Sequence, residues 1–397
     1  MLDLSKNERM PTRREALDAI LSKWKPAPQS ETIPVDEALG RVAARDHVSR
    51  HDLPVVRASS MDGVGVDSSL FAKGVPDASA WRAGVEYARA DTGDDFDDRF
   101  DAVIPIEAVR FPPGGGISFE ADLCVTPGMN VRPAGSSVRK GERLVAAGTR
   151  LRPFDLSVLV LGGLREAEVI KKPVVAFIPT GSELVPQGSA PARGQTVDSN
   201  SALARHMLAE MGAAPLCLPI VRDDPEALRA AIRRARAEAD IVLLCGGSSK
   251  GGEDFNAEIV AEMGESLFHW IASAPGRPTA AAMLDGAPLI NMPGPPPAAY
   301  FVMDWCVRAL VTRFLGTPET ARKTVRALLP DGLDATPGME ILRKLELQKT
   351  GDAYEARAME LKAVSVVRAL TAPAQLVTDA GPRGREPGER VEIELLR

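Results

Sequence analysis

The stretch from Ile241 to Phe255, IVLLCGGSSKGGEDF, decides the fold class. Its first five residues are apolar and partly β-branched, which favours a strand buried on both faces of a parallel sheet. Glycines, serines and one lysine follow, so the strand leads into a loop with exposed backbone amides. Such a loop can approach a ligand closely and hold an anion, and Asp254 would place a carboxylate beside it. A Gly-rich turn without a ligand looks the same, so this stretch alone does not separate the two.

Strands and helices alternate on both sides of this stretch, from residue 173 to residue 315. We expect strands at 174–178, 216–221 and 241–245, and helices at 198–211 and 225–239. Asp224 and Pro225 suit the N-cap and first position of the second helix, and Asp198, Ser199 and Asn200 cap the first. The alternation predicts a doubly wound parallel sheet with right-handed crossovers.

Ligands of such sheets bind at the carboxyl ends of the strands. Four loops are expected at that edge. The first carries Thr180, Gly181 and Glu183, and the second is the Gly-rich stretch already quoted. The other two are APGRP at 274–278 and NMPGPPP at 291–297. Their convergence on one edge predicts a binding site there.

The flanking segments differ in character from the α/β region. Residues 53–137 are rich in Gly, Pro and short β-like runs, and residues 319–397 contain three alternating runs typical of half-buried strands. The segment 15–24 favours a helix, and 35–44 favours a helix or a strand. The segments 156–162 and 166–170 favour a helix and a strand. We therefore predict α/β plus β structure in four domains: a discontinuous linker domain (1–52 with 138–172), a β-rich insert (53–137), the α/β domain (173–318) and a terminal β-barrel-like domain (319–397).

Composition restricts the function classes. The 397 residues are 45% hydrophobic and 26% charged with a net charge of −6, which is typical of a globular protein and argues against general nucleic-acid binding. No apolar run suits a membrane span or a leader, so we expect a cytoplasmic protein without a membrane partner. The four cysteines are scattered and are interpreted as reduced core thiols. Trp270 and Trp305 are expected in the core or at an interface.

Two features of the inserted region carry carboxylates. Asp62 precedes Gly63 in MDGVGVD, a pattern that is usually only a turn. The acidic run 91–101 surrounds Thr92 and Gly93. It is interpreted as a solvated loop, although carboxylates beside Thr92 could also hold a cation.

Six short motifs in order carry a resemblance to a known family. They are MDG at 61–63, TGSEL at 180–184, DSN at 198–200, GGSSKGGEDF at 246–255, PGRP at 275–278 and MPGPP at 292–296. Together they resemble the molybdopterin molybdenumtransferases, which include bacterial MoeA and the gephyrin E domain. The resemblance covers essentially the whole chain.

The resemblance implies an elongated homodimer of four-domain subunits. It also implies insertion of molybdate into adenylylated molybdopterin, helped by Mg²⁺, with release of AMP. Asp62, Glu183 and Asp254 would be catalytic, Asp62 typically across the dimer interface, and Glu183 and Asp254 would hold the metal. Further partners would be a molybdopterin adenylyltransferase and an apo-molybdoenzyme. The implied cofactor-binding residues are Thr92, Gly93, Thr180, Gly181, Asp198, Ser199, Asn200, Gly246, Gly247, Ser249, Lys250, Gly251, Pro275, Gly276, Arg277, Pro293 and Gly294.

The chain departs from the family pattern in the substrate loops. Ala274 and Arg277 stand where the family usually has lysines, and Pro295 stands where the usual PGNP has asparagine. Lys250 could restore part of the lost positive charge.

Three readings therefore stay open: an active transferase, a relative that binds molybdopterin or finished cofactor and delivers it to a molybdoenzyme, and a dimeric interaction scaffold. The joint presence of Asp62, Glu183 and Asp254 favours the transferase.

Overall fold

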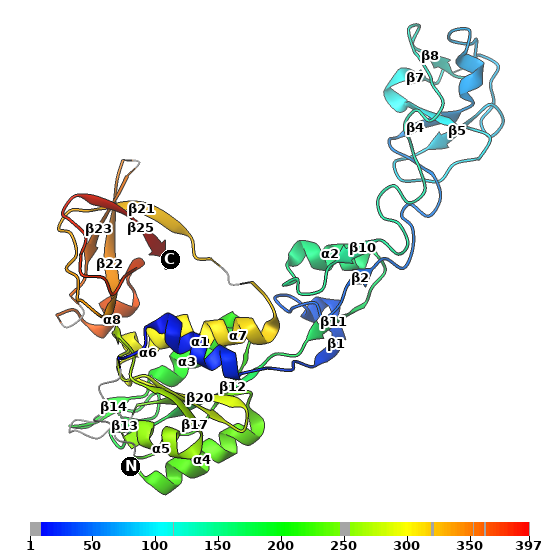
Figure 1. The fold of residues 1–397 in the computed structure, drawn as a ribbon. Coiled ribbons are helices and arrows are strands. Elements are labelled where there is room, and N and C mark those ends of the chain that lie inside the picture. Colours follow the sequence, from blue (N-terminus) through cyan, green and yellow to red (C-terminus); the bar gives the residue numbers. More distant parts are fainter. Residues whose placement is uncertain are drawn as a thin grey trace. The chain divides into compact units, whose positions relative to one another are not determined.

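The computed structural model describes residues 9–113, 115–246, 255–318, 321–351, 353–360 and 363–396. The chain forms two compact units (Figure 1). The larger unit combines the residues up to Gln29 with those from Ile170 onward, and the smaller unit is Ser30–Val169. Helix α1 (Arg13–Lys23), which the predicted domain ranges group with 138–172, thus belongs to the larger unit. The four ranges themselves stay a prediction.

A six-stranded sheet is the centre of the larger unit. Its strand order is β15-β12-β16-β20-β19-β17. The strands are β12 (Val174–Pro179), β15 (Ala214–Cys217), β16 (Ile241–Cys245), β17 (Glu265–His269), β19 (Ala280–Leu284) and β20 (Ala287–Met292). β15 ends before Pro219, so the expected strand at 216–221 is shorter and lies earlier in the chain.

The sheet is parallel from β15 to β20, whereas β19 and β17 run antiparallel to their neighbours. The prediction of an all-parallel sheet is wrong at this edge. Only Asp285 and Gly286 connect β19 to β20, and both have positive φ, of 48° and 77°. A connection of two residues makes a hairpin, because a parallel crossover needs a dozen residues or more.

Helices cover both faces of this sheet (Figure 1). α4 (Pro225–Glu238) and α5 (Phe255–Met263) lie on one face, where Ile232, Leu244 and Leu289 belong to one buried cluster. The other face carries α1, α3 (Asn200–Met211), α6 (Pro296–Val302) and α7 (Arg308–Leu315), with a π-helical turn, η4 (Met303–Val307), between the last two. The Asp224 side chain accepts a hydrogen bond from the Ala227 amide at 2.7 Å, which confirms the predicted N-cap of α4.

The C-terminal strands close into a barrel. They are β21 (Thr324–Leu329), β22 (Glu340–Thr350), β23 (Ala353–Ala358), β24 (Ala374–Thr378) and β25 (Glu389–Leu395), with the short helix α8 (Val366–Leu370) before β24. β24 pairs with both β25 and β22, so the five strands form a closed ring around Leu345, Ala356 and Ile393. This confirms the predicted β-barrel-like structure. β18 (Ser273–Ala274) pairs in parallel with Glu340 and Ile341 at the start of β22.

The smaller unit has a three-stranded sheet and a second core. β4 (Gly63–Val66) lies between β5 (Tyr87–Ala90) and β6 (Ala102–Pro105), over Val64, Ile104 and Ile117. The second core gathers Leu159 of α2 (Pro153–Leu161) and Val169 of β11 (Glu166–Ile170). At 35–44, where a helix or a strand was expected, the chain forms the 3₁₀ turn η1 (Val35–Glu37) and isolated β-bridges at Val42 and Ala43.

Short elements complete both units. The smaller unit contains β1 (Ser30–Pro34), β2 (His47–Val48), β3 (Ala58–Ser59), β7 (Val109–Arg110), β8 (Ser118–Phe119), β9 (Val131–Arg132), β10 (Arg143–Val145), η2 (Ser68–Phe71) and η3 (Ile106–Ala108). The larger unit adds the parallel pair β13 (Leu184–Val185) and β14 (Thr196–Val197).

Two sequence expectations concern the chain as a whole. None of the helices within the described ranges combines the length and apolar character that a membrane crossing requires. All four cysteines are free thiols. Cys245 and Cys306 are buried, whereas Cys217 is half-buried and Cys124 is exposed, so the prediction of core thiols is right for only two of them.

Candidate functional site

Three neighbouring strand ends define one edge of the α/β sheet. β12, β16 and β20 are adjacent and parallel, so their carboxyl ends lie side by side. The Thr180 amide donates to the Cys245 carbonyl at 2.9 Å, and the Gly246 amide donates to the Met292 carbonyl at 3.1 Å. The sheet ladder thus continues into the first residue of each loop and fixes where the loops begin.

Gly246 is the tightest point of this edge. Its φ is +124°, and a Cβ at this position would lie 2.1 Å from the Thr180 carbonyl oxygen. On its other side, a Cβ added to Gly294 would lie 3.5 Å from the Gly246 Cα. The backbones of three loops therefore touch here, and only glycine fits at position 246.

Glu183 folds back over the first loop. A Cβ at Gly181 would lie 2.7 Å from the Glu183 Oε2 atom, so the carboxylate covers the Gly181 peptide. Glu183 is exposed, and within the described part of the chain its carboxylate has no hydrogen-bond or ion-pair partner. An exposed and unpaired carboxylate at this edge is available to a cation or to a ligand.

Two asparagines bind the loop starts from opposite faces of the sheet. Asn256, in the first turn of α5, donates through Nδ2 to the Thr180 Oγ1 atom at 2.8 Å and to the Gly246 carbonyl at 3.0 Å. Asn200, at the start of α3, donates to the Gly294 carbonyl at 2.7 Å and contacts the Cys245 Sγ atom at 3.3 Å. Hydrogen bonds inside a buried region hold their partners more firmly than exposed ones.

Sequence reasoning missed Asn256 and Asn291, both fully buried. The Asn256 Oδ1 atom and both amide atoms of Asn291 have no hydrogen-bond partner within the described residues. Asn291 lies two residues beyond Leu289 on β20 and hence on the face that α5 covers. Unpaired buried polar groups cost about 1–3 kcal/mol each, so their presence calls for an explanation. A polar residue in an otherwise apolar run was the available signal.

The DSN motif lies at the beginning of α3. The Asp198 Oδ1 atom accepts a hydrogen bond from the Ser201 amide at 3.0 Å, and Asp198 is buried. The Ser199 side chain makes no capping hydrogen bond. Asp198 therefore orients the first turn of α3, and with it the Asn200 side chain.

The PGRP loop reaches the same edge from the antiparallel side. Ala280, the first residue of β19, pairs with Asn291 near the end of β20, so the loop before β19 lies at the carboxyl edge. Gly276 has a φ of +110°. The carbonyl of Arg277 accepts a hydrogen bond from the Ile271 amide at 2.9 Å. The Arg277 side chain is exposed. Pro275 precedes this turn.

The smaller unit contains another candidate site residue, Asp62, which is hydrogen-bonded to Thr92. The Asp62 Oδ1 atom accepts hydrogen bonds from the Thr92 amide at 2.7 Å and the Thr92 hydroxyl at 2.8 Å. These two bonds lower the pKa of Asp62, whose carboxylate is exposed. Gly93, with a φ of +90°, completes the turn by donating to the Ser59 carbonyl at 2.9 Å.

Several predicted site residues lie outside the described residues: Gly247, Ser249, Lys250, Gly251 and Asp254. In the ranges that are described, no group of three or more His, Cys, Asp or Glu side chains could hold a metal ion. The metal role of Glu183 and Asp254 therefore stays a prediction.

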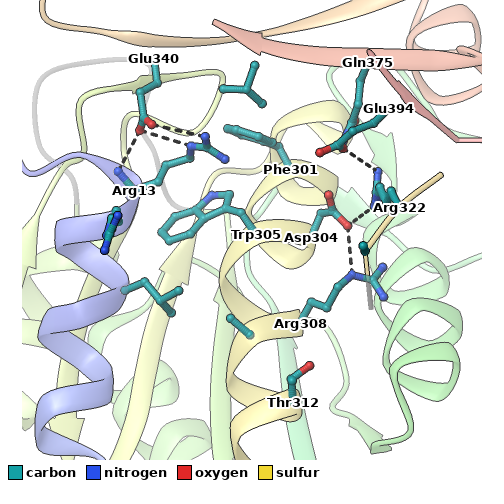
Figure 2. Close-up of a pocket in the computed structure, with 15 residues that line it drawn as sticks. Arg13, Phe301, Asp304, Trp305, Arg308, Thr312, Arg322, Glu340, Gln375 and Glu394 are labelled. Atoms are coloured by element: carbon teal, nitrogen blue, oxygen red, sulfur yellow. Dashed lines mark hydrogen bonds and ion pairs between the residues drawn. The ribbon is translucent and has the colours of Figure 1, made fainter. Parts of the chain in front are cut away.

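A pocket of about 590 Å³ lies elsewhere in the larger unit (Figure 2). It lies between α1, the helices from α6 to α7 and the barrel strands β22, β24 and β25, and no predicted site residue lines it. Arg13 pairs with Glu340 at 3.2 Å on one side. On the other side, Asp304 pairs with Arg308 at 3.2 Å and also with Arg322. Because most of its charged side chains are paired with one another, the pocket has the character of a structural ion network.

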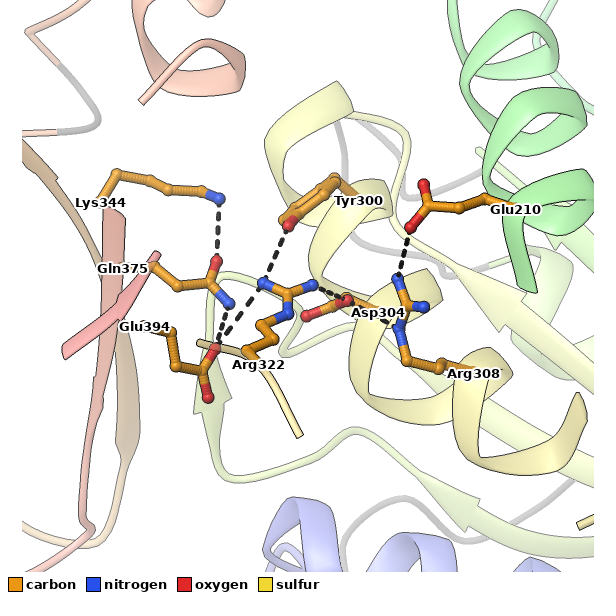
Figure 3. A network of polar contacts seen from close by, with 8 residues as sticks. All are labelled: Glu210, Tyr300, Asp304, Arg308, Arg322, Lys344, Gln375 and Glu394. Carbon is orange, nitrogen blue, oxygen red and sulfur yellow. Dashed lines mark hydrogen bonds and ion pairs between the residues drawn. The ribbon is translucent and has the colours of Figure 1, made fainter. Parts of the chain in front are cut away.

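Lys344 lies at the buried end of this network (Figure 3). Its side chain is 1% exposed, and its Nζ atom donates to the Gln375 Oε1 atom at 2.9 Å and lies 4.0 Å from the centroid of the Tyr300 ring. Burial lowers the pKa of Lys344 to about 8. Gln375 in turn donates to Glu394 at 2.9 Å, and Glu394 lies 3.7 Å from Arg322, which pairs with Asp304 of η4. Polar contacts thus link the barrel to the helices over the sheet.

Comparisons with known proteins agree with this architecture. The MoeA N-terminal region (domain I and II) matches residues 12–163, and a probable molybdopterin binding domain matches residues 176–313. A molybdopterin molybdenumtransferase of Bacillus subtilis is 27% identical over 388 residues, covering 93% of this chain and 90% of that protein. One from Haemophilus influenzae is 28% identical over 303 residues, covering 73% and 74%. The crystal structure of a molybdopterin biosynthesis MoeA protein from Pyrococcus horikoshii is 27% identical, with a TM-score of 0.81 over 98% of this chain and 100% of that one.

Fold and site together define a multidomain protein that presents a candidate ligand site at the carboxyl edge of an α/β sheet. With the matches to both of its regions and to whole relatives, the chain belongs to the MoeA family.

Proposed function

We propose that this protein inserts molybdate into adenylylated molybdopterin and releases AMP, as a step of molybdenum cofactor biosynthesis. The observation that carries the proposal is the edge where the loops after β12, β16 and β20 meet backbone to backbone. The names of relatives that match along most of their own length support the same reaction.

The ligand is a phosphate ester, and the edge offers the groups that hold phosphates. Backbone amides of the glycine loops and the Arg277 guanidinium would bind phosphate oxygens. Thr180, Gly181, Asp198, Ser199 and Asn200 would shape the wall around them, with Pro275, Gly276, Pro293 and Gly294 opposite. In the loop after Gly246, we assign Gly247, Ser249, Lys250 and Gly251 to the same ligand.

Mg²⁺ would bind at this edge through carboxylate ligands. Glu183 offers an exposed carboxylate without a partner in the described part of the chain, and carboxylate oxygens are preferred Mg²⁺ ligands. We propose that Glu183 and Asp254 hold the ion. When bound, Mg²⁺ would stabilise negative charge on the oxygens of the pyrophosphate bond that is cleaved. Molybdate is a substrate in this scheme, and its negative charge favours the same amides and Arg277.

Asp62 supplies a further carboxylate, which accepts two hydrogen bonds from Thr92. We assign it to catalysis, with Thr92 and Gly93 as its supporting loop. A homodimer, contacts with a molybdopterin adenylyltransferase and an apo-molybdoenzyme, and a cytoplasmic location belong to the same proposal.

The proline-rich loop after β20 is compatible with this function. Pro295 is the N-cap residue of α6 and Pro296 is its first helical residue. Amides at these positions have no partner within a helix, so the prolines remove no helical hydrogen bond. The departure from PGNP thus changes ligand contacts without disturbing the helix that follows.

Two substitutions test the proposal. Purified protein is incubated with adenylylated molybdopterin, molybdate and Mg²⁺, and AMP and the activation of an apo-molybdoenzyme are measured. We expect Asp62→Asn and Glu183→Gln each to lower the rate of AMP release by about 100-fold, because each loses a charge that acts in the transition state. Glu107→Gln is the matched control, because Glu107 is an exposed carboxylate of η3 that has no proposed role in the site. If the wild-type protein binds molybdopterin tightly and releases no AMP, a delivery protein is the better account.

A further inference from the structure

Trp270 has an unusual backbone conformation for a bulky side chain. It follows β17 directly, its φ is +69°, and it is 39% exposed. Left-handed backbone is costly for residues other than glycine and is kept where the surrounding structure requires it. Trp270 is therefore not a core residue, and its expected place at an interface stays a prediction.

The loop from 270 to 279 places Trp270 opposite Arg277. The Trp270 amide donates to the Thr279 carbonyl at 2.9 Å, and the Ile271 amide donates to the Arg277 carbonyl at 2.9 Å. The Thr279 hydroxyl also donates to the Gly276 carbonyl at 2.5 Å. Hydrogen bonds from Trp270 and Ile271 therefore hold the turn that carries Arg277.

The two side chains stack within this frame. The Arg277 guanidinium carbon lies 4.9 Å from the centroid of the Trp270 ring. Among the described residues, Arg277 has no carboxylate partner that would compete with the indole. A guanidinium stacked on an aromatic face still presents its N–H edges, and it can bind two phosphate oxygens at once.

We propose that Trp270 is a positioning residue for Arg277. The indole face holds the guanidinium at the carboxyl edge of the sheet with its donors directed to a phosphate group of the ligand. This inference rests on the proposed function, which makes a phosphate ester the ligand. It also explains why arginine is used at position 277: the planar guanidinium stacks on an indole, whereas a lysine ammonium has no planar face.

A double-mutant cycle tests the coupling. Trp270→Leu and Trp270→Phe are made in the wild-type and in the Arg277→Lys background, and the Kd of adenylylated molybdopterin is measured by calorimetry, with KM and kcat for AMP release. We expect Trp270→Leu to raise Kd and KM about threefold, the size of an exposed cation–π contact, with kcat unchanged. Trp270→Phe retains most of the affinity. In the Arg277→Lys background, Trp270→Leu changes Kd by less than a factor of two.

Trp270→Gly separates positioning from folding. Glycine adopts the φ of +69° without strain, so this variant keeps the loop conformation and its thermal unfolding midpoint while losing affinity as Trp270→Leu does. Molybdopterin without the adenylate is measured in parallel. A loss confined to the adenylylated ligand assigns Arg277 to the adenylate phosphate, and a loss with both ligands assigns it to the molybdopterin phosphate.

Equal losses in the two Arg277 backgrounds, or an unchanged Kd in Trp270→Leu, overturn the positioning role. The proposed function fails separately, through absence of AMP release from the wild-type protein.

Discussion

At the residue scale, the Asn256 side chain forms hydrogen bonds with both the loop after β12 and the loop after β16. Its Nδ2 atom donates to the Thr180 Oγ1 atom and to the Gly246 carbonyl. In Asn256→Asp a carboxylate would face the Gly246 carbonyl, and two oxygen atoms cannot share a hydrogen bond without a proton. We predict that kcat/KM for AMP release falls about tenfold, as expected when a buried group loses its partner.

The Asn256→Asp prediction needs a control for general damage to α5. Glu258→Gln changes an exposed carboxylate two residues further along the same helix and should leave kcat/KM unchanged. Normal activity of Asn256→Asp at full stability would show that the two loop starts do not depend on this side chain.

Lys344 gives a prediction about pH and stability. Burial lowers its pKa in the folded protein to about 8, below the ordinary 10.5, so the unfolded chain binds this proton more tightly. Between these two values the unfolded state holds more protons, and the contribution of Lys344 to the free energy of unfolding rises with pH. Below pH 8 the cost of the buried charge is fully present, and it disappears above pH 10.5.

The measurement compares unfolding midpoints at pH 7 and pH 9.5 for the wild type and Lys344→Met. We predict that the midpoint of the wild type, taken relative to this variant, increases over this range, because only the wild type loses the buried charge. Lys349→Met, at an exposed position on the same strand, should follow the wild type at both pH values. A constant difference between wild type and Lys344→Met would mean that Lys344 does not titrate in this window.

At the element scale, the ends of β12, β16 and β20 build the candidate site, and Gly246 is where they are closest. We predict that Gly246→Ala lowers the free energy of unfolding of the larger unit by about 2 kcal/mol or more and abolishes AMP release, because its Cβ would lie 2.1 Å from a carbonyl oxygen. Urea unfolding followed by circular dichroism measures the first effect. Gly381→Ala, whose Cβ meets no atom within 4 Å, should unfold as the wild type does. Equal midpoints for the two variants would contradict the tight packing at Gly246.

Strand periodicity predicted most of these elements. A strand that is buried on both faces is apolar throughout, as β12 and β16 are. A strand that is buried on one face alternates between apolar and polar residues, and this alternation predicted β22, β23 and β25. Neither β19 nor its antiparallel direction was predicted, although Asp285 and Gly286 between two apolar runs are a hairpin signal. The length of the connection between two neighbouring strands decides whether they run parallel or antiparallel, and the short connection at Asp285 and Gly286 was not used in the prediction.

The candidate site was predictable where it rests on glycine loops and carboxylates, whose residue types show their chemistry in the sequence. Asn256, Asn291 and the stacking of Trp270 on Arg277 were not, because each depends on which face a residue takes after folding. Asn291 stands out as a polar residue within an apolar run, whereas the polar residues around Asn256 hide that one from a reading of the sequence.

At the scale of the whole molecule, both units match regions of the MoeA family, so we assign their residues to one reaction. The larger unit carries the sheet edge with Glu183 and Arg277, and the smaller unit carries the Asp62 and Thr92 cluster. The account requires that both serve the same event, in which molybdenum insertion and AMP release occur together.

The ratio of AMP released to molybdenum inserted tests this claim most directly. Wild-type protein is given adenylylated molybdopterin and Mg²⁺ with and without molybdate, and AMP and protein-bound molybdenum are measured in the same samples. The account predicts one AMP for each molybdenum inserted, and neither product without molybdate. Tight binding of the ligand with no AMP, or AMP release without molybdenum in the product, would contradict it.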